Sequence, residues 1–116
     1  MLERTHEISK LTDEFREVTR DEIASGNVET QEDVERFVDE STDVYFEKVQ
    51  MGRYDKMEIF TDLRGGTSLK AYKAREGDTL QDLVDRMIRD QLHHVLRYIA
   101  NETFHLSDVT ESGDVV

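Results

Sequence analysis

The chain has 116 residues, of which 27 are acidic and 15 basic, giving a formal net charge of −12. This length suits one domain with a single modest core and is too short for two. The absence of cysteine excludes disulfides, thiolate zinc sites and cysteine nucleophiles, and it favours a reducing, cytoplasmic setting. We expect neither a signal peptide nor a membrane-spanning helix, because no run approaches the roughly 18 apolar residues that a span requires.

The charge is unevenly distributed along the chain. Residues 1–50 hold 15 acids and 6 bases, residues 51–78 hold 5 and 6, and residues 79–116 hold 7 and 3. Direct binding to nucleic acid or anionic lipid is disfavoured, because both need a basic stripe. A basic partner is the natural complement of such a surface. The alternative left open is that the acidity serves only solubility or adaptation to high salt.

Apolar spacing predicts a mainly α fold of three to four helices. A first helix covers 5–24, where four apolar residues recur three and four positions apart: Ile8, Leu11, Phe15 and Val18. A second begins at Thr30, with Asp33 completing a capping box. Its pattern resets near 41–43, so residues 44–52 either continue it or form a separate helix.

The stretch 57–73 permits two interpretations. Glu58–Leu63 is rich in Ile, Phe and Thr, and Gly65-Gly66 suits a tight turn, which favours a β-hairpin. The spacing of Tyr54, Met57, Phe60 and Leu63 permits a short helix instead. We expect the hairpin.

The last helix is expected to be long and central. Thr79 and Asp82 form a second capping pair, and the apolar residues of 80–99 advance largely in steps of four, so their face drifts around the helix. A face this broad predicts contact with more than one neighbour, including a second subunit. We therefore expect one domain over 1–105, a homodimer through the last helix, and a flexible tail over 106–116.

A search for catalytic and metal-binding patterns indicates neither an enzyme nor a cofactor. Glu-x-x-His spacings occur at Glu3/His6 and Glu102/His105, but di-iron bundles need further carboxylates that project inward. Residues 64–67 lack the Gly-Lys-Ser/Thr of a phosphate loop. No metal site is predicted.

The acid-rich first half is the candidate partner-binding surface. On helices, carboxylates three or four residues apart stand about 5–6 Å apart, which is comparable to the phosphate spacing of a nucleic-acid strand. Such an array can occupy the basic groove of a DNA- or RNA-binding protein. The candidate residues are Asp13, Glu14, Glu17, Asp21, Glu22, Glu29, Glu32, Asp33, Glu35, Asp39, Glu40, Asp43 and Glu47.

The layout resembles the phage Ocr family of antirestriction proteins. The similar parts are Ile23 to Val38 and Thr79 to about Phe104, the latter with Met-Ile-Arg-Asp-Gln-Leu at 87–92. This resemblance implies an acidic helical dimer that imitates duplex DNA and inhibits a restriction or CRISPR-type defence protein. The chain departs from the family in its milder acidity and in the stretch 53–78, which has no counterpart.

The size of the charge limits the mimicry. Duplex DNA carries one charge per roughly 1.7 Å, so a face about 40 Å long presents more than twenty charges. A net charge of −12 therefore requires either a dimer or a short footprint. The alternative function is a non-mimic interaction or assembly module that contacts its partner through apolar surface on 80–99 or through 53–78.

Overall fold

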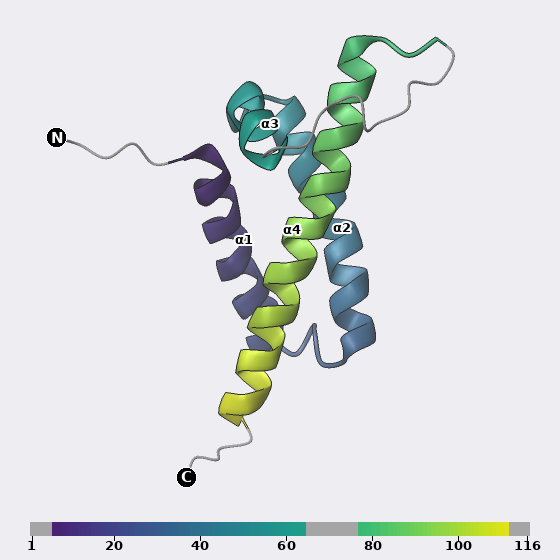
Figure 1. Cartoon of the computed structure of the whole chain (residues 1–116). Coiled ribbons are helices and arrows are strands. Elements are labelled where there is room, and N and C mark those ends of the chain that lie inside the picture. Colours follow the sequence, from purple (N-terminus) through teal and green to yellow (C-terminus); the bar gives the residue numbers. More distant parts are fainter. Residues whose placement is uncertain (1–5, 65–76, 112–116) are drawn as a thin grey trace, which may run out of the picture.

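Four helices follow one another along the chain: α1 (Glu7–Ala24), α2 (Gln31–Gln50), α3 (Lys56–Arg64) and α4 (Leu80–Glu111). The computed structural model describes residues 6–64 and 77–111, with side chains up to residue 107. As Figure 1 shows, α1 and α2 run in opposite directions along α4, and α3 lies across one end of the assembly. The mainly helical fold with a long last helix is confirmed. No helix in the described ranges is long and apolar enough to cross a membrane.

The first two helices begin and end close to where their sequences indicate. Thr30 caps α2, since its side chain accepts from the Asp33 N–H at 3.1 Å while the Asp33 carboxylate accepts from the Thr30 N–H at 3.1 Å. The expected capping box is therefore present. After α1 the chain turns at Gly26, whose φ of 84° suits a residue without a side chain.

α2 is unbroken through the polar stretch 41–43. Ser41 and Thr42 are buried, and the Thr42 hydroxyl donates to the Val38 carbonyl at 2.8 Å. That bond satisfies a buried polar group within the helix, so the break in the apolar pattern does not end it. Of the two alternatives for 44–52, the structure shows the continuing helix, which ends at Gln50.

The hairpin prediction is wrong for the part of 57–73 that is described. Residues up to Arg64 form α3, and the rest of the expected hairpin, 65–73, lies outside the described residues. Ile59 and Phe60 are 0% and 7% exposed, with Leu63 packed beside them. The i, i+1, i+4 spacing of these residues builds one helix face, and its burial overrides the strand preference of Ile, Phe and Thr.

α4 fills the centre of the molecule. Its buried residues face three helices of the same chain, since α1, α2 and α3 all pack against it. The capping pair of Thr79 and Asp82 is confirmed by reciprocal bonds of 2.9 and 3.1 Å. Helix neighbours within one chain thus account for the breadth of the apolar face without a second subunit. α4 also continues to Glu111, past the domain end expected at residue 105.

Candidate partner-binding surface

The thirteen candidate carboxylates all lie on α1, on α2 or in the connection between them, but they do not form one uniform face. Their surroundings divide them into residues paired with α4, residues bound elsewhere on α1, α2 or the segment before α3, and residues with no side-chain partner among those that the structure describes. Only the last group is available to a partner without loss of an internal interaction.

A ladder of polar pairs joins α2 to α4. Glu35 pairs with Arg97 at 3.3 Å, Asp39 with His93 at 3.1 Å, and Asp43 with Arg89. The rungs are four residues apart on both antiparallel helices, so each lies about one turn from the next. A further rung, between the side-chain amides of Gln31 and Asn101 at 2.6 Å, extends the same series. Three of the candidate carboxylates therefore have a side-chain partner on α4, an arginine for Glu35 and Asp43 and a histidine for Asp39.

Asp33 belongs to the capping box and not to a free surface. Its carboxylate accepts from the Glu29 N–H at 2.9 Å and from the Thr30 N–H, and it pairs with Arg36 at 3.1 Å. The two backbone donors, Glu29 first, lower the pKa of Asp33. Asp13 pairs with Arg16 at 3.2 Å and Glu17 with Arg20 at 3.0 Å, each about one turn further along α1.

Glu14 connects α1 to α2 and to the segment before α3. Its carboxylate accepts from Lys48 Nζ at 2.8 Å, from the Tyr54 hydroxyl at 2.7 Å and from the Tyr45 hydroxyl at 3.2 Å. The bond from Lys48, then the bond from Tyr54, lower the pKa of Glu14. Burial, followed by the effects of the Glu14 carboxylate, raises the pKa of both tyrosines. Glu14 is thus an interhelical anchor.

Six candidate carboxylates have no side-chain partner within the described ranges 6–64 and 77–107. Four lie around the connection between α1 and α2, and two follow along α2. The last two are seven residues apart and therefore on one side of the helix. The six are Asp21, Glu22, Glu29, Glu32, Glu40 and Glu47.

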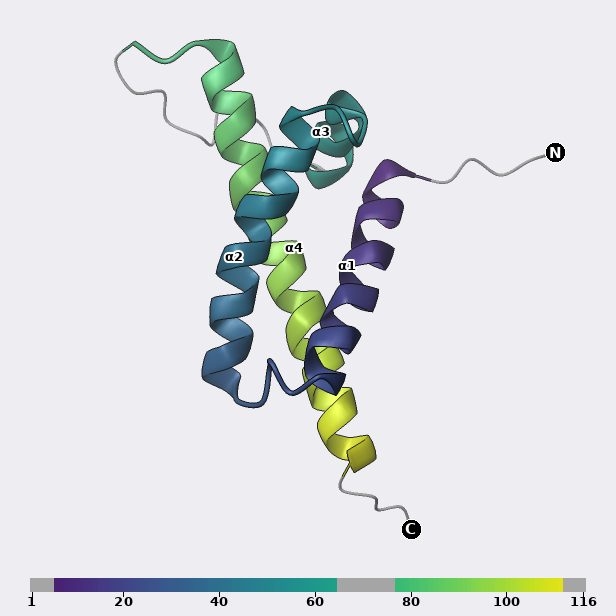
Figure 2. The same cartoon turned by 180° about the vertical axis from the view of Figure 1, so that it is seen from behind.

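A groove of about 370 Å³ lies between α1 and α2. These two helices both pack on α4 but make fewer contacts with each other than any other pair. Figure 2, seen from behind, shows them side by side with α4 beyond them. The groove is lined by apolar and acidic side chains together with Lys48: Glu14, Val18, Glu22, Phe37, Glu40, Ser41, Val44, Tyr45 and Lys48.

Sequence reasoning did not identify this groove. An apolar residue in 44–52 such as Val44 is expected to be buried on a helix, but the structure leaves Val44 50% exposed. Phe37 is only partly buried, although its ring stacks on Phe15 with centroids 5.5 Å apart. The signal that could have indicated a groove is the width of the apolar arc on α2, which Phe37 and Val44 extend beyond the side that faces α4.

The apolar surface of the alternative function is largely internal. In 80–99, Val84, Met87, Ile88, Leu92, Leu96 and Ile99 are buried, whereas Leu80 and Tyr98 are each 69% exposed. Of the stretch 53–78, the structure describes residues 53–64, 77 and 78. Among these residues, Met57 is 60% exposed.

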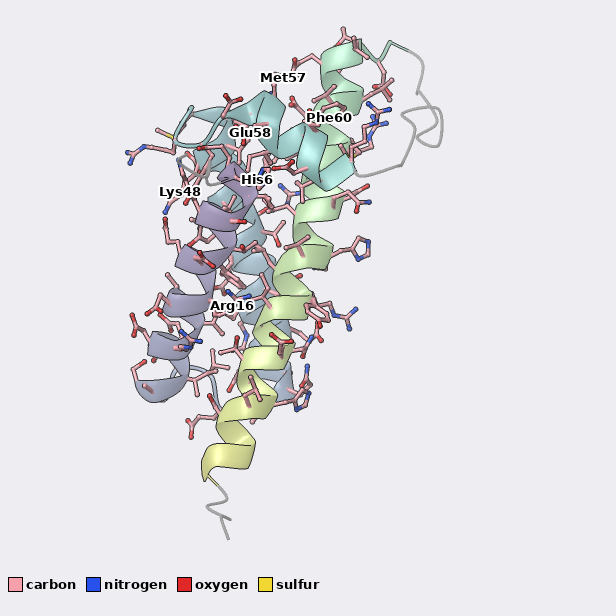
Figure 3. The ribbon with its side chains drawn as sticks, turned by 60° about the vertical axis from the view of Figure 1, so that its left-hand side comes forward. His6, Arg16, Lys48, Met57, Glu58 and Phe60 are labelled. Carbon is pink, nitrogen blue, oxygen red and sulfur yellow. The ribbon has the colours of Figure 1, made fainter. Side chains whose placement is uncertain are left out.

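One group of potential metal ligands occurs in the described part of the chain. His6 Nδ1 lies 3.9 Å from Glu58 Oε1 and 4.0 Å from Asp62 Oδ2, and the three ligand atoms are within 4.8 Å of one another. Figure 3 shows His6 and Glu58 close together where α3 passes the start of α1. The Asp62 Oδ2 atom is buried without a hydrogen-bond partner. The sequence search missed this group because it tested only local Glu-x-x-His spacings, and Glu3 of one such pair lies outside the described residues.

Comparison of the chain with protein-family models, with curated proteins and with solved structures gave no match.

Proposed function

We propose that the protein is an acidic inhibitor that binds a basic protein through α1 and α2 and occupies a surface that otherwise holds DNA or RNA. The observation that carries this proposal is a set of six carboxylates that are unpaired within residues 6–64 and 77–107: Asp21, Glu22, Glu29, Glu32, Glu40 and Glu47. Like charges that are not compensated internally destabilise the folded chain through mutual repulsion. A basic partner relieves that repulsion, and the salt dependence of binding reports it.

The dimensions favour mimicry of one strand by one chain. α2 has 20 residues and is therefore about 30 Å long, at 1.5 Å per residue. Over that length one nucleic-acid strand carries about nine phosphates and a duplex about eighteen. Of the six carboxylates, Glu32, Glu40 and Glu47 lie on α2, and the other three lie around its start. Together they are nearer to the number of phosphates on one strand than to the number on a duplex. Imitation of a longer duplex requires two chains, and the homodimer through α4 stays a prediction.

The experiment uses two double variants with equal charge change. Glu40→Lys with Glu47→Lys reverses two of the three α2 carboxylates in this set, whereas Asp90→Lys with Glu102→Lys reverses two exposed carboxylates of α4. Each immobilised protein is incubated with host lysate, and captured proteins are eluted with single-stranded or duplex oligonucleotide at constant ionic strength. We expect wild type and the α4 variant to capture a nucleic-acid-binding protein that oligonucleotide releases, and the α2 variant to lose it.

Two results would contradict the proposal. If the α2 variant captured the partner as well as wild type does, Glu40 and Glu47 would not belong to the interface. A captured protein that high salt releases but neither oligonucleotide displaces would show that the partner surface is not the one that holds nucleic acid. The salt dependence itself should be steep, because each neutralised charge pair releases counterions.

A further inference from the structure

The groove between α1 and α2 combines features that a surface for charge mimicry alone does not need. Its walls bring half-buried Val18 and Phe37 next to Val44, which is 50% exposed. These apolar side chains contribute nothing to the imitation of phosphates, which requires negative charge alone. They can stabilise a complex by removing an apolar side chain of the partner from water.

Contacts between α1 and α2 hold several of the residues that line the groove. At one position Glu14 accepts bonds from Lys48, Tyr45 and Tyr54, which fix the separation of α1 and α2 there. In addition, the ring of Phe15 on α1 stacks on Phe37 of α2 and meets Tyr45 of α2 edge-on, with centroids 5.8 Å apart in the second pair. A partner side chain therefore enters a formed groove without first separating the helices, which lowers the cost of binding.

The charges at the groove select the partner. Glu22 on α1 and Glu40 on α2 line opposite walls, and neither has a side-chain partner among the described residues. A volume of about 370 Å³ is at the low end for ligand pockets and suits one or two apolar side chains. An occupant that satisfies both features has apolar anchors with Lys or Arg on either side.

We infer that the α1–α2 groove binds a Lys/Arg-rich amphipathic helix of the partner, with an apolar side chain of that helix inserted against Val44 and Phe37. Helix-in-groove recognition of this kind reads anchors three or four residues apart. This inference rests on the proposed function and specifies it: the captured element is a basic helix that carries apolar anchors, and not merely a positively charged surface.

The probe is a synthetic amphipathic peptide of about 14 residues with Leu and Lys at helical spacing and one Trp at an anchor position. The protein contains no Trp, so a blue shift of peptide fluorescence reports burial of that anchor. A peptide of the same composition in scrambled order, with the same charge and Trp, is the control probe. We expect the amphipathic peptide to bind with a blue shift, and the scrambled peptide to bind more weakly without one.

Protein variants separate the apolar and electrostatic contributions. Val44→Ser changes an exposed position in the groove, so the fold should persist, and circular dichroism checks this; Leu80→Ser is the matched control on α4. We expect Val44→Ser to weaken the amphipathic peptide about fivefold or more and to leave the scrambled peptide unchanged. The double variant Glu22→Gln with Glu40→Gln should weaken the binding of both peptides. Leu80→Ser should change the binding of neither peptide.

The outcomes distinguish the two proposals. If Val44→Ser and Leu80→Ser bind the amphipathic peptide equally, the groove inference is wrong, while a loss with Glu22→Gln and Glu40→Gln still supports the acidic interface. If neither peptide responds to the double variant, the acidic interface fails as well. If instead the wild-type chain self-associates in sedimentation and the Val44→Ser variant does not, a second copy occupies the groove and the inference is overturned.

Discussion

Glu14 accepts a 2.7 Å hydrogen bond from the hydroxyl of Tyr54, a buried residue of the segment between α2 and α3. The same carboxylate also binds Tyr45 and Lys48 of α2. One acidic residue on α1 thus holds three donors from the rest of the chain. Its charge stabilises the fold, which separates it from the carboxylates that we assign to a partner.

Removal of this carboxylate should destabilise the protein. Glu14→Ala leaves the hydroxyls of Tyr45 and Tyr54 without their acceptor, and we expect a loss of about 1–2 kcal/mol in the free energy of unfolding. Glu17→Ala is the matched control on α1, because Glu17 is 70% exposed and, in the part of the chain that the structure describes, its carboxylate pairs with Arg20 alone. That variant should change stability by less than about 0.5 kcal/mol. Urea denaturation measures both, and equal losses would deny Glu14 its anchoring role.

The contribution of Glu14 should disappear in acid. Because its pKa lies below the ordinary value of 4.5, the folded state binds this proton less readily than the unfolded state. The stabilisation is therefore fully present above about pH 4.5 and is lost as the pH falls through the lowered pKa. The difference in unfolding free energy between wild type and Glu14→Gln should shrink between pH 6 and pH 3, roughly following protonation of the carboxylate. A difference that stays constant with pH would show that the geometry of the hydrogen bonds, and not the charge of Glu14, stabilises the fold.

The ladder between α2 and α4 should contribute less to stability than the core beneath it. Arg97→Glu opposes Glu35 with a like charge and should cost about 1 kcal/mol or less, since both partners are partly exposed. Exchanging the pair, Glu35→Arg with Arg97→Glu, should restore most of the loss. Leu92→Ala, at a fully buried position of α4, should cost about 2–5 kcal/mol. A double-mutant cycle in denaturant gives the pair energy, and absence of recovery in the exchanged variant would exclude a direct Glu35–Arg97 interaction.

The cap of α4 offers a further test. Thr79→Ala removes the acceptor for the Asp82 N–H and should lower stability by about 0.5–2 kcal/mol. Thr61→Ala serves as control, because the Thr61 hydroxyl only donates to the Met57 carbonyl on an exposed side of α3. Thermal unfolding followed by circular dichroism compares the two. A larger effect at Thr61 would show that the start of α4 depends on other contacts.

The helices were predictable where local signals and burial agree. Thr30 with Asp33, and Thr79 with Asp82, are capping pairs that involve residues three apart, so the sequence alone contains the whole interaction. α3 was not predictable in this way. The composition of Glu58–Leu63 favours a strand, and only packing of Ile59 and Phe60 in the core makes the helix more stable.

The candidate surface was predictable as a region but not residue by residue. Counting acids places the charge on the first half of the chain, yet it cannot show that Asp39 meets His93, 54 residues away, or that Glu40 has no described partner. Whether a carboxylate is compensated depends on which helices become neighbours. The same dependence hid the groove, because the sequence does not show which apolar residues of α2 stay exposed, as Val44 does, once α4 is in place.

The ladder also has a kinetic consequence. Arg97 and Arg89 of α4 pair with Glu35 and Asp43 on one flank of α2, while Glu40 and Glu47 on another flank have no partner among the described residues, so the charge around α2 is asymmetric. In the field of a basic partner this asymmetry favours an approach from the α1–α2 side before the surfaces touch. Association should therefore slow steeply with added salt, whereas dissociation, governed by the buried anchor, should respond much less. The internal pairing of Glu35, Asp39 and Asp43 thus gives the protein a preferred direction of approach.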